Sequence, residues 1–160
     1  MTLDQVIATA INPALALLPA KMDTPAARVM LLATGLQESR FEHRRQMGNG
    51  PARSFWQMER GGGVVGVMTH AASKDLMQSL CVTRGVAFKA LDIWNAIEFD
   101  DVLAAGAARL LYWTDSGKLP ATTDTAAAWA LYLRTWRPGR PHPQTWPAYH
   151  RTARSALLLP

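Results

Sequence analysis

The sequence predicts a single, mainly α-helical domain with one short irregular or β segment in its first half. Apolar residues recur at helical spacing through most of the chain, and residues that favour helix N-caps precede several of these runs. Glycine-rich polar sequence is concentrated between residues 48 and 63. A chain of 160 residues is long enough for one domain with a sizeable core and short for two, so we expect residues 1–160 to fold as one unit.

The N-terminal apolar run, from Val6 to Ala20, is predicted to form two helical turns packed on the domain. No basic residue precedes it, Asp4 does, and Asn12-Pro13 interrupts it. These features do not match a signal peptide, and the run is too short to span a bilayer.

A long buried helix is predicted to begin at Thr24 and Pro25, which suit the N-cap and the first helical position. Its apolar residues recur at helical spacing and are Val29, Leu32, Ala33 and Leu36. We expect the helix to end near Ser39, because the stretch Gly48-Asn49-Gly50-Pro51 cannot continue it.

Residues 54–59, with the sequence SFWQME, are predicted to form a short extended segment, and Gly61-Gly62-Gly63 a flexible turn. No Gly-Lys-Ser/Thr sequence follows these glycines, so a phosphate-binding loop is not indicated. Two helices are expected next, over residues 73–82 and 86–97, with Gly85 between them.

Three further helices are predicted in the second half of the chain. The first is capped by Asp100 or Asp101 and reaches about Trp113. The second covers residues 125–136 and is stopped by Pro138-Gly139, and the third covers residues 147–158. Three tryptophans in this half are expected to pack in the core: Trp129, Trp136 and Trp146.

Charge and cysteine content limit the classes of function. The formal net charge is +5 and the pI is about 9.9, so the surface should favour polyanions such as nucleic acid, anionic membranes or bacterial cell wall. The lone Cys81 excludes an internal disulfide and a Cys-rich zinc site, and the histidines show no metal-ligand spacing. We therefore expect neither a metal nor a cofactor.

Glu38 is the residue that most strongly suggests chemistry. It borders the apolar stripe where the long helix is predicted to end, and burial there would desolvate the carboxyl group and raise its pKa. An acid that stays protonated near neutral pH can donate a proton to a leaving-group oxygen. The loop that follows carries Phe55 and Trp56, whose faces suit the apolar faces of sugar rings. This combination favours cleavage of a glycosidic bond.

The element Glu38-Ser39-x-Phe41 is followed by a glycine-containing loop and then by Ala52-x-Ser54-Phe55-Trp56-Gln57. This order and spacing resemble the goose-type lysozyme and soluble lytic transglycosylase superfamily, whose pattern is ES-x-F followed by GA-x-GLMQ. The resemblance covers residues 30–59. It implies a lysozyme-like fold, with the β excursion directly after the helix that bears Glu38, and one peptidoglycan-cleaving domain over residues 1–160.

The resemblance also implies the site residues. Glu38 would be the single catalytic acid/base, and Ser39 would orient it. The substrate-binding residues would be Ser39, Phe55, Trp56, Gln57 and Tyr132. Tyr132 is matched only to the tyrosine of the family's AYNAG element, and core packing is an equally open role for it. Three positions depart from the family pattern: Pro51 and Ser54, where glycine is preferred, and Trp56, where methionine is common.

The implied reaction is cleavage of the β-1,4 bond between N-acetylmuramic acid and N-acetylglucosamine in peptidoglycan. In a lytic transglycosylase, Glu38 protonates the glycosidic oxygen. It then acts as a base while the 6-hydroxyl of N-acetylmuramic acid attacks the anomeric carbon, which gives a 1,6-anhydro product. A hydrolase usually needs a second carboxylate. Glu59 is one candidate, and Glu42 is another if the helix continues past Glu38, so both reactions stay open.

The expected partner is the glycan strand of the bacterial cell wall, in the periplasm. Since no signal peptide is recognised, we expect delivery by a phage virion, release from a host cytoplasm as an endolysin, or a dedicated secretion machine. Two other classes stay open: a catalytically degenerate wall-binding domain, and a basic helical module that binds nucleic acid through arginines of residues 134–154. The second class has no helix-turn-helix pattern in its favour. One basic cluster is either a solvated face or a contact for peptide carboxylates or anionic wall polymer: Arg134, Arg137 and Arg140.

Overall fold

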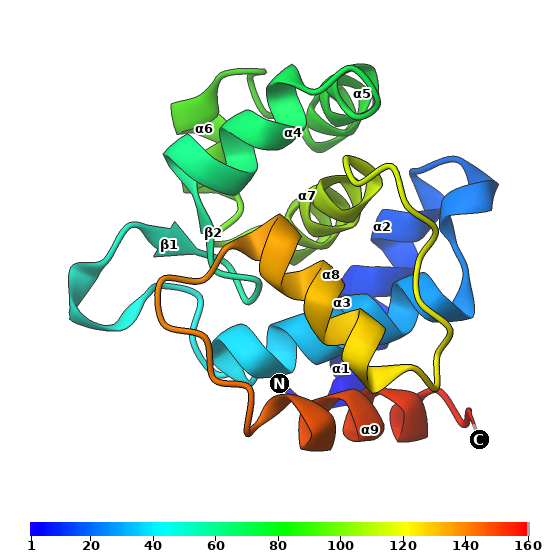
Figure 1. The fold of residues 1–160 in the computed structure, drawn as a ribbon. Coiled ribbons are helices and arrows are strands. Elements are labelled where there is room, and N and C mark those ends of the chain that lie inside the picture. The colour runs from blue at the N-terminus through cyan, green and yellow to red at the C-terminus, as the bar shows by residue number, and fades with distance from the viewer. Residues whose placement is uncertain (160) are drawn as a thin grey trace.

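The computed structural model describes residues 1–159 and is mainly helical with a small two-stranded sheet, as the sequence predicts (Figure 1). A hydrophobic core cluster of buried residues draws on every α-helix from α1 to α9. Within residues 1–159, no helix is long and apolar enough to cross a bilayer.

The N-terminal run forms consecutive helical turns, as expected, although they begin before Val6. Helix α1 (Leu3–Val6) is followed by a π-helical turn η1 (Ile7–Ile11) and by α2 (Asn12–Ala16). Thr2 caps α1 through a capping box with Gln5. A short 3-10 turn, η2 (Ala20–Met22), leads to the long helix.

Helix α3 (Pro25–Ser39) has the predicted beginning and end. The Thr24 hydroxyl accepts a 3.1 Å hydrogen bond from the Ala27 amide, which satisfies a free donor of the first turn. The helix stops because Arg40 takes a left-handed conformation with a φ of 54°. The chain then folds back so closely that a Cβ at Gly35 would overlap the Phe41 ring, which explains the absence of a side chain there.

The β excursion follows α3 and the 3-10 turn η3 (Met47–Asn49). Strands β1 (Ala52–Arg53) and β2 (Met58–Glu59) are antiparallel, with Ala52 opposite Glu59 and Arg53 opposite Met58. The prediction of an extended segment over residues 54–59 is correct only for its last two residues, because Ser54 to Gln57 form the turn that joins the strands.

The prediction of a flexible turn at Gly61-Gly62-Gly63 is wrong. These glycines lie in a π-helical turn, η4 (Arg60–Val64), which continues into α4 (Val65–Thr69). Val64 and Val67 are fully buried, so core packing of the following valines holds the glycines in helical conformation. Glycine adopts helical backbone as well as the backbone of a turn, so tertiary contacts decide which of the two forms.

Helix α5 (Lys74–Arg84) ends at Gly85, which has a φ of 66°. The Val86 amide then bonds the Cys81 carbonyl, which closes the helix end and delays α6 (Ala90–Ala96) past the predicted start at residue 86.

The last three helices agree closely with expectation. Asp100 caps α7 (Asp101–Trp113) by accepting a 2.9 Å bond from the Leu103 amide, and Asp124 caps α8 (Thr125–Trp136) in the same way through Ala127. Helix α9 (Trp146–Ala156) completes the chain and packs along α3. Figure 1 shows α4, α5 and α6 together at one end of the molecule, with α1, α3, α8 and α9 towards the other.

Candidate active site

A cleft of about 1210 Å³ opens beside the C-terminal end of α3. Its walls come from that helix end, the small sheet, the η4–α4 segment, the end of α7, the end of α8 and the connector that follows α8. The lining side chains that matter most for chemistry are Glu38, Gln57, Glu59, Asp115, Trp136 and Arg137. Segments that are far apart in the sequence therefore meet at one place.

Glu38 lies in this cleft, half-buried in the last turn of α3. Burial desolvates the carboxylate and raises the pKa of Glu38 to about 7, which is the effect expected from its place beside the apolar stripe. A hydrogen bond from Tyr132 acts in the opposite direction, and the nearby charge of Glu59 adds to the increase. The group is thus poised to give and to take a proton near neutral pH.

Tyr132 holds the Glu38 carboxyl group from the opposite helix. Its hydroxyl donates a 2.6 Å hydrogen bond to Oε1 of Glu38, and the phenol itself is buried in α8. The ring is stacked on both Trp129 and Trp146, with centroids 5.1 and 5.0 Å away. The ring of Tyr132 therefore packs in the core, and its hydroxyl contacts the candidate acid. Tyr132 is not among the residues that line the cleft, and its predicted role in substrate binding stays a prediction.

Ser39 does not contact the Glu38 carboxyl group in the way that was predicted. Its buried hydroxyl donates a 2.7 Å bond to the Phe55 carbonyl and accepts a 3.1 Å bond from the Phe41 amide. Ser39 thereby ties the end of α3 to the turn between β1 and β2. Its influence on Glu38 passes through the backbone, and the role of direct substrate contact is not supported.

The turn between the strands holds Ser54 and Gln57 in left-handed conformations, with φ of 70° and 47°. Left-handed backbone favours glycine, so a serine at position 54 needs support from its surroundings. Here the Ser54 amide donates a 2.7 Å bond to the Arg44 carbonyl, and its hydroxyl accepts a 3.2 Å bond from the Trp56 amide. These contacts stabilise the strained position.

Gln57 lines the cleft, as predicted. Its side-chain amide donates a 2.7 Å bond to the Ser54 carbonyl across the same turn. This bond holds the side chain against the turn.

The prediction that Phe55 and Trp56 present aromatic surface to a sugar is wrong. Both side chains are in the core, Phe55 with 1% and Trp56 with 0% of its surface exposed. The Trp56 indole donates a 2.9 Å bond to the Leu31 carbonyl, and Phe41 packs edge-on against both rings. The left-handed residues on either side of this pair turn the two aromatic side chains inward.

Trp136 is the aromatic residue that sequence reasoning missed. Among the side chains that line the cleft within residues 1–159, it is the one Trp, Tyr or Phe. It was expected in the core, yet it is half-buried, as is Trp129, whereas Trp146 is buried as predicted. Its indole donates a 2.8 Å bond to the Trp56 carbonyl, and its ring lies 4.6 Å from that of Tyr112. Its position one helical turn after Tyr132, just before the basic connector, was the signal available in the sequence.

The two candidate second carboxylates differ in position. Glu59 is exposed at the end of β2 and lines the same cleft as Glu38. Glu42 follows the end of α3 instead of continuing it, and its carboxylate pairs with Arg40 at 3.4 Å and lies 3.8 Å from His43 on the surface. The structure thus removes the helical geometry on which the case for Glu42 depended.

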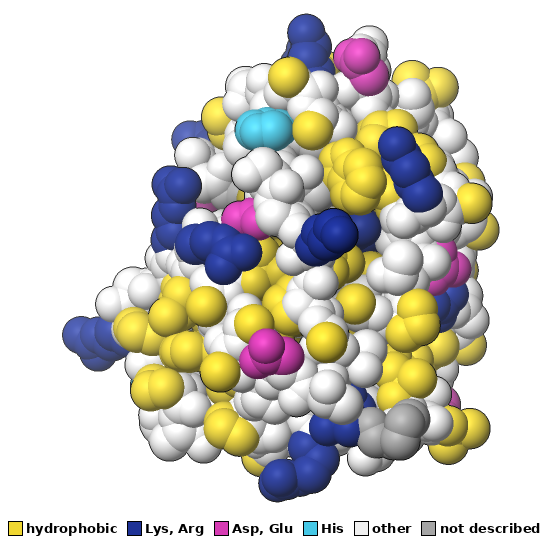
Figure 2. All heavy atoms as spheres, turned by 45° about the vertical axis from the view of Figure 1, so that its right-hand side comes forward, with side chains coloured by type: hydrophobic (Ala, Val, Ile, Leu, Met, Phe, Trp, Pro, Cys, Tyr) yellow, Lys and Arg dark blue, Asp and Glu magenta, His cyan; other side chains and the backbone are white. Residues whose placement is uncertain are grey.

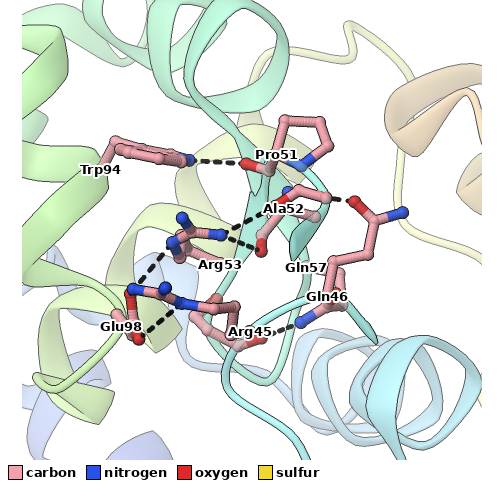
Figure 3. Close-up of polar contacts among 10 residues, drawn as sticks. Arg45, Gln46, Pro51, Ala52, Arg53, Gln57, Trp94 and Glu98 are labelled. Carbon is pink, nitrogen blue, oxygen red and sulfur yellow. Dashed lines mark hydrogen bonds and ion pairs between the residues drawn. The ribbon is translucent and has the colours of Figure 1, made fainter. Parts of the chain in front are cut away.

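A polar network fixes the β excursion against α6 and the residues after it (Figure 3). Glu98 is buried and pairs with Arg53 at 2.9 Å and with Arg45 at 3.0 Å. The Arg53 guanidinium also lies over the Trp94 ring, and the Trp94 indole donates a 2.7 Å bond to the Pro51 carbonyl. The wall of the cleft opposite α8 is therefore rigidly supported.

Among the described residues, neither a metal-ligand cluster nor a reactive cysteine is found outside this cleft. Within residues 1–159, no three His, Cys, Asp or Glu side chains are placed to hold a metal ion. Cys81 is buried in α5, and burial raises the pKa of its thiol to about 11, so the nucleophilic thiolate is scarce at neutral pH.

None of the protein families, curated proteins or solved structures compared with this chain matches it.

Proposed function

We propose that this protein cleaves the glycan strands of bacterial peptidoglycan, with Glu38 as the acid/base. The observation that carries the proposal is the state of Glu38: a half-buried carboxyl group in an open cleft, held by Tyr132, with a pKa of about 7. The resemblance of residues 30–59 to the lysozyme and lytic transglycosylase superfamily supplies the substrate class. The lysozyme-like fold is part of this proposal.

The arrangement supports a lytic transglycosylase reaction. Protonated Glu38 donates its proton to the glycosidic oxygen as the bond to the anomeric carbon breaks. The resulting carboxylate then accepts the proton of the N-acetylmuramic acid 6-hydroxyl, whose oxygen bonds to the anomeric carbon. The products are a 1,6-anhydro end and a free N-acetylglucosamine end. Trp136 offers an aromatic face for a sugar ring, and Gln57 offers an amide oxygen for a hydroxyl or N-acetyl group.

A hydrolase is the second candidate, and one observation favours it. Glu59 lines the cleft near enough to raise the pKa of Glu38 through its charge. A second carboxylate can activate or position a water molecule for attack on the anomeric carbon. In that case the product has a reducing end instead of an anhydro ring.

The experiment that tests the proposal is digestion of purified peptidoglycan by the wild type and by Glu38→Gln, with the soluble fragments identified by mass spectrometry. Anhydro-muropeptides from the wild type alone support the transglycosylase, and reducing ends from the wild type alone support the hydrolase. No release by a folded wild-type protein contradicts both and favours a wall-binding role.

A further inference from the structure

Some of the arginines that line the cleft form ion pairs with carboxylates, and others do not. Arg134 forms a two-point pair with Asp115, with distances of 2.6 and 3.2 Å. Arg45 is engaged by Glu98 at 3.0 Å. Within residues 1–159, Arg137 and Arg140 also line the cleft and have no ion pair. These two guanidinium groups are exposed and therefore free to bind an anion.

The backbone around Arg137 and Arg140 is held in place. Arg137 ends α8 in a left-handed conformation with a φ of 51°, and its side chain donates a 3.3 Å bond back to the Arg134 carbonyl. Pro138 and Pro141 each follow one of the two arginines and restrict the backbone there. The two arginines are thus presented from a stiff connector and not from a mobile tail.

The same connector is tethered to the neighbour of the candidate acid. The Gln37 side-chain amide donates a 3.2 Å bond to the His142 carbonyl, and the Thr145 hydroxyl donates a 2.9 Å bond to Oε1 of Gln37. Gln37 precedes Glu38 in α3, so the connector is anchored directly beside the candidate acid. An anion bound by Arg137 or Arg140 would lie in the same cleft as the bond to be cleaved.

The remaining charge in the cleft favours an anionic ligand. The chain has a net charge of +5, and Lys and Arg side chains are prominent on the face shown in Figure 2. Glu38 must be protonated to act as an acid, which leaves Glu59 as the carboxylate without an ion pair among the described cleft residues. Guanidinium groups bind carboxylates with paired, charge-assisted hydrogen bonds.

We infer that Arg137 and Arg140 bind carboxylate groups carried by the glycan substrate, so that the cleft selects anionic, wall-type strands over neutral chitin-type strands. The inference rests on the proposed function. Two sources of carboxylate exist on such strands: the lactyl group of N-acetylmuramic acid and the peptide attached to it. Both present the same chemistry to the two arginines.

The experiment measures binding and does not depend on cleavage. Glu38→Gln protein is co-sedimented with purified sacculi from which covalently attached wall polymers have been stripped, so that phosphate is absent. Adding Arg137→Gln and Arg140→Gln should weaken binding roughly tenfold, since two charge-assisted contacts are lost. The matched control carries Lys74→Gln and Arg151→Gln, which remove two exposed charges outside the cleft, and should change binding less than about twofold.

Two treated substrates identify the group that is bound. Sacculi whose carboxyl groups have been converted to amides should bind the parent more weakly and erase the difference between the parent and the double variant. On strands stripped of peptide by an amidase, a persisting difference assigns the contact to the lactyl carboxylate, and its loss assigns it to the peptide.

Equal binding of the double variant and the control to untreated sacculi overturns the inference. Arg140 is not part of the end of α8, so Arg140→Gln alone should leave that helix end unchanged. Weaker binding by this single variant would therefore not be explained by a folding defect at the helix end. If the wild type cleaves sacculi while the arginine variants bind normally, the inference fails and the proposed function stands. If the wild type cleaves nothing but the arginine variants bind sacculi more weakly, the proposed cleavage fails and the binding of carboxylates by the two arginines stands.

Discussion

The Tyr132 hydroxyl and Oε1 of Glu38 are 2.6 Å apart and join two residues that are 94 positions apart in the chain. The phenol donates to the carboxylate, and this favours the charged form against the desolvation that disfavours it. Trp129 and Trp146 pack against the Tyr132 ring and against each other, and this cluster holds the phenol in place beside Glu38. This bond therefore both orients Glu38 and limits the increase of its pKa.

Replacing Tyr132 by Phe should shift the high-pH limb of the cleavage rate to higher pH. The substitution keeps the stacked ring and removes the bond that lowers the pKa of Glu38. The maximal rate should fall about tenfold, because the carboxyl group loses its orientation. Rates of wall digestion between pH 5 and 9 provide the measurement. Tyr149→Phe on α9, outside the cleft, is the control, and an identical profile for both variants would show that the bond has no role.

The stability of the wild type relative to Glu38→Gln should fall as pH rises. The folded pKa is about 7 against an ordinary value of 4.5, so the folded state holds the proton more tightly than the unfolded chain. Below pH 4.5 both states are protonated and no penalty arises. The penalty grows between these two pKa values and reaches at most about 3 kcal/mol above pH 7.

Denaturant unfolding of both proteins at pH 4, 6 and 8 measures this difference. All other groups are common to the two proteins and cancel in the comparison. A difference in unfolding free energy that stays constant over this range would mean that Glu38 titrates normally.

Trp136 should contribute both a sugar platform and a structural bond, and two substitutions separate these. Trp136→Phe keeps an aromatic face but loses the hydrogen bond to the Trp56 carbonyl, with a cost of about 1 kcal/mol in stability. Trp136→Ala also loses the face, so its KM should rise about tenfold. Steady-state digestion of soluble glycan strands and thermal unfolding give the two quantities. Equal KM values for the two variants would argue against sugar stacking.

Neutralising Glu98 should destabilise the protein more than neutralising Asp115. Glu98→Gln leaves the buried guanidinium of Arg53 without its carboxylate, which costs about 3 kcal/mol. Asp115→Asn breaks a pair in which Arg134 is half exposed, with a cost below about 1 kcal/mol. Free energies of unfolding in urea measure both. The reverse order would show that the Glu98 network does not hold the β excursion.

The beginnings of α3, α7 and α8 were predictable because their determinants are local. Thr24, Asp100 and Asp124 each cap a helix with the side-chain bond that their residue type suggests. Glycines were harder to interpret, since they permit several conformations and leave the choice to distant contacts. The triplet at residues 61–63 is helical because the valines beyond it are buried, and this depends on the packing of the whole chain.

The candidate site was only partly predictable, because a motif gives residue types without side-chain directions. Glu38 and Gln57 line the cleft as the motif implies, and Tyr132 reaches the acid from α8. Phe55 and Trp56 point into the core because of the positive φ angles beside them, which no spacing reveals. Trp136 has the exposure to the cleft that had been assigned to that pair.

The candidate acid lies early in the chain, whereas the residues that orient it and form the opposite wall of the cleft lie late. A nascent chain that has reached only the end of α7 contains Glu38 and the β excursion but lacks the phenol, the cleft tryptophan and the whole wall formed by α8 and its connector. Partial products of translation therefore contain the acid without its orienting bond or the α8 wall of the cleft. For a protein proposed to cut the bacterial cell wall, a chain that stops before α8 is therefore expected to be inactive.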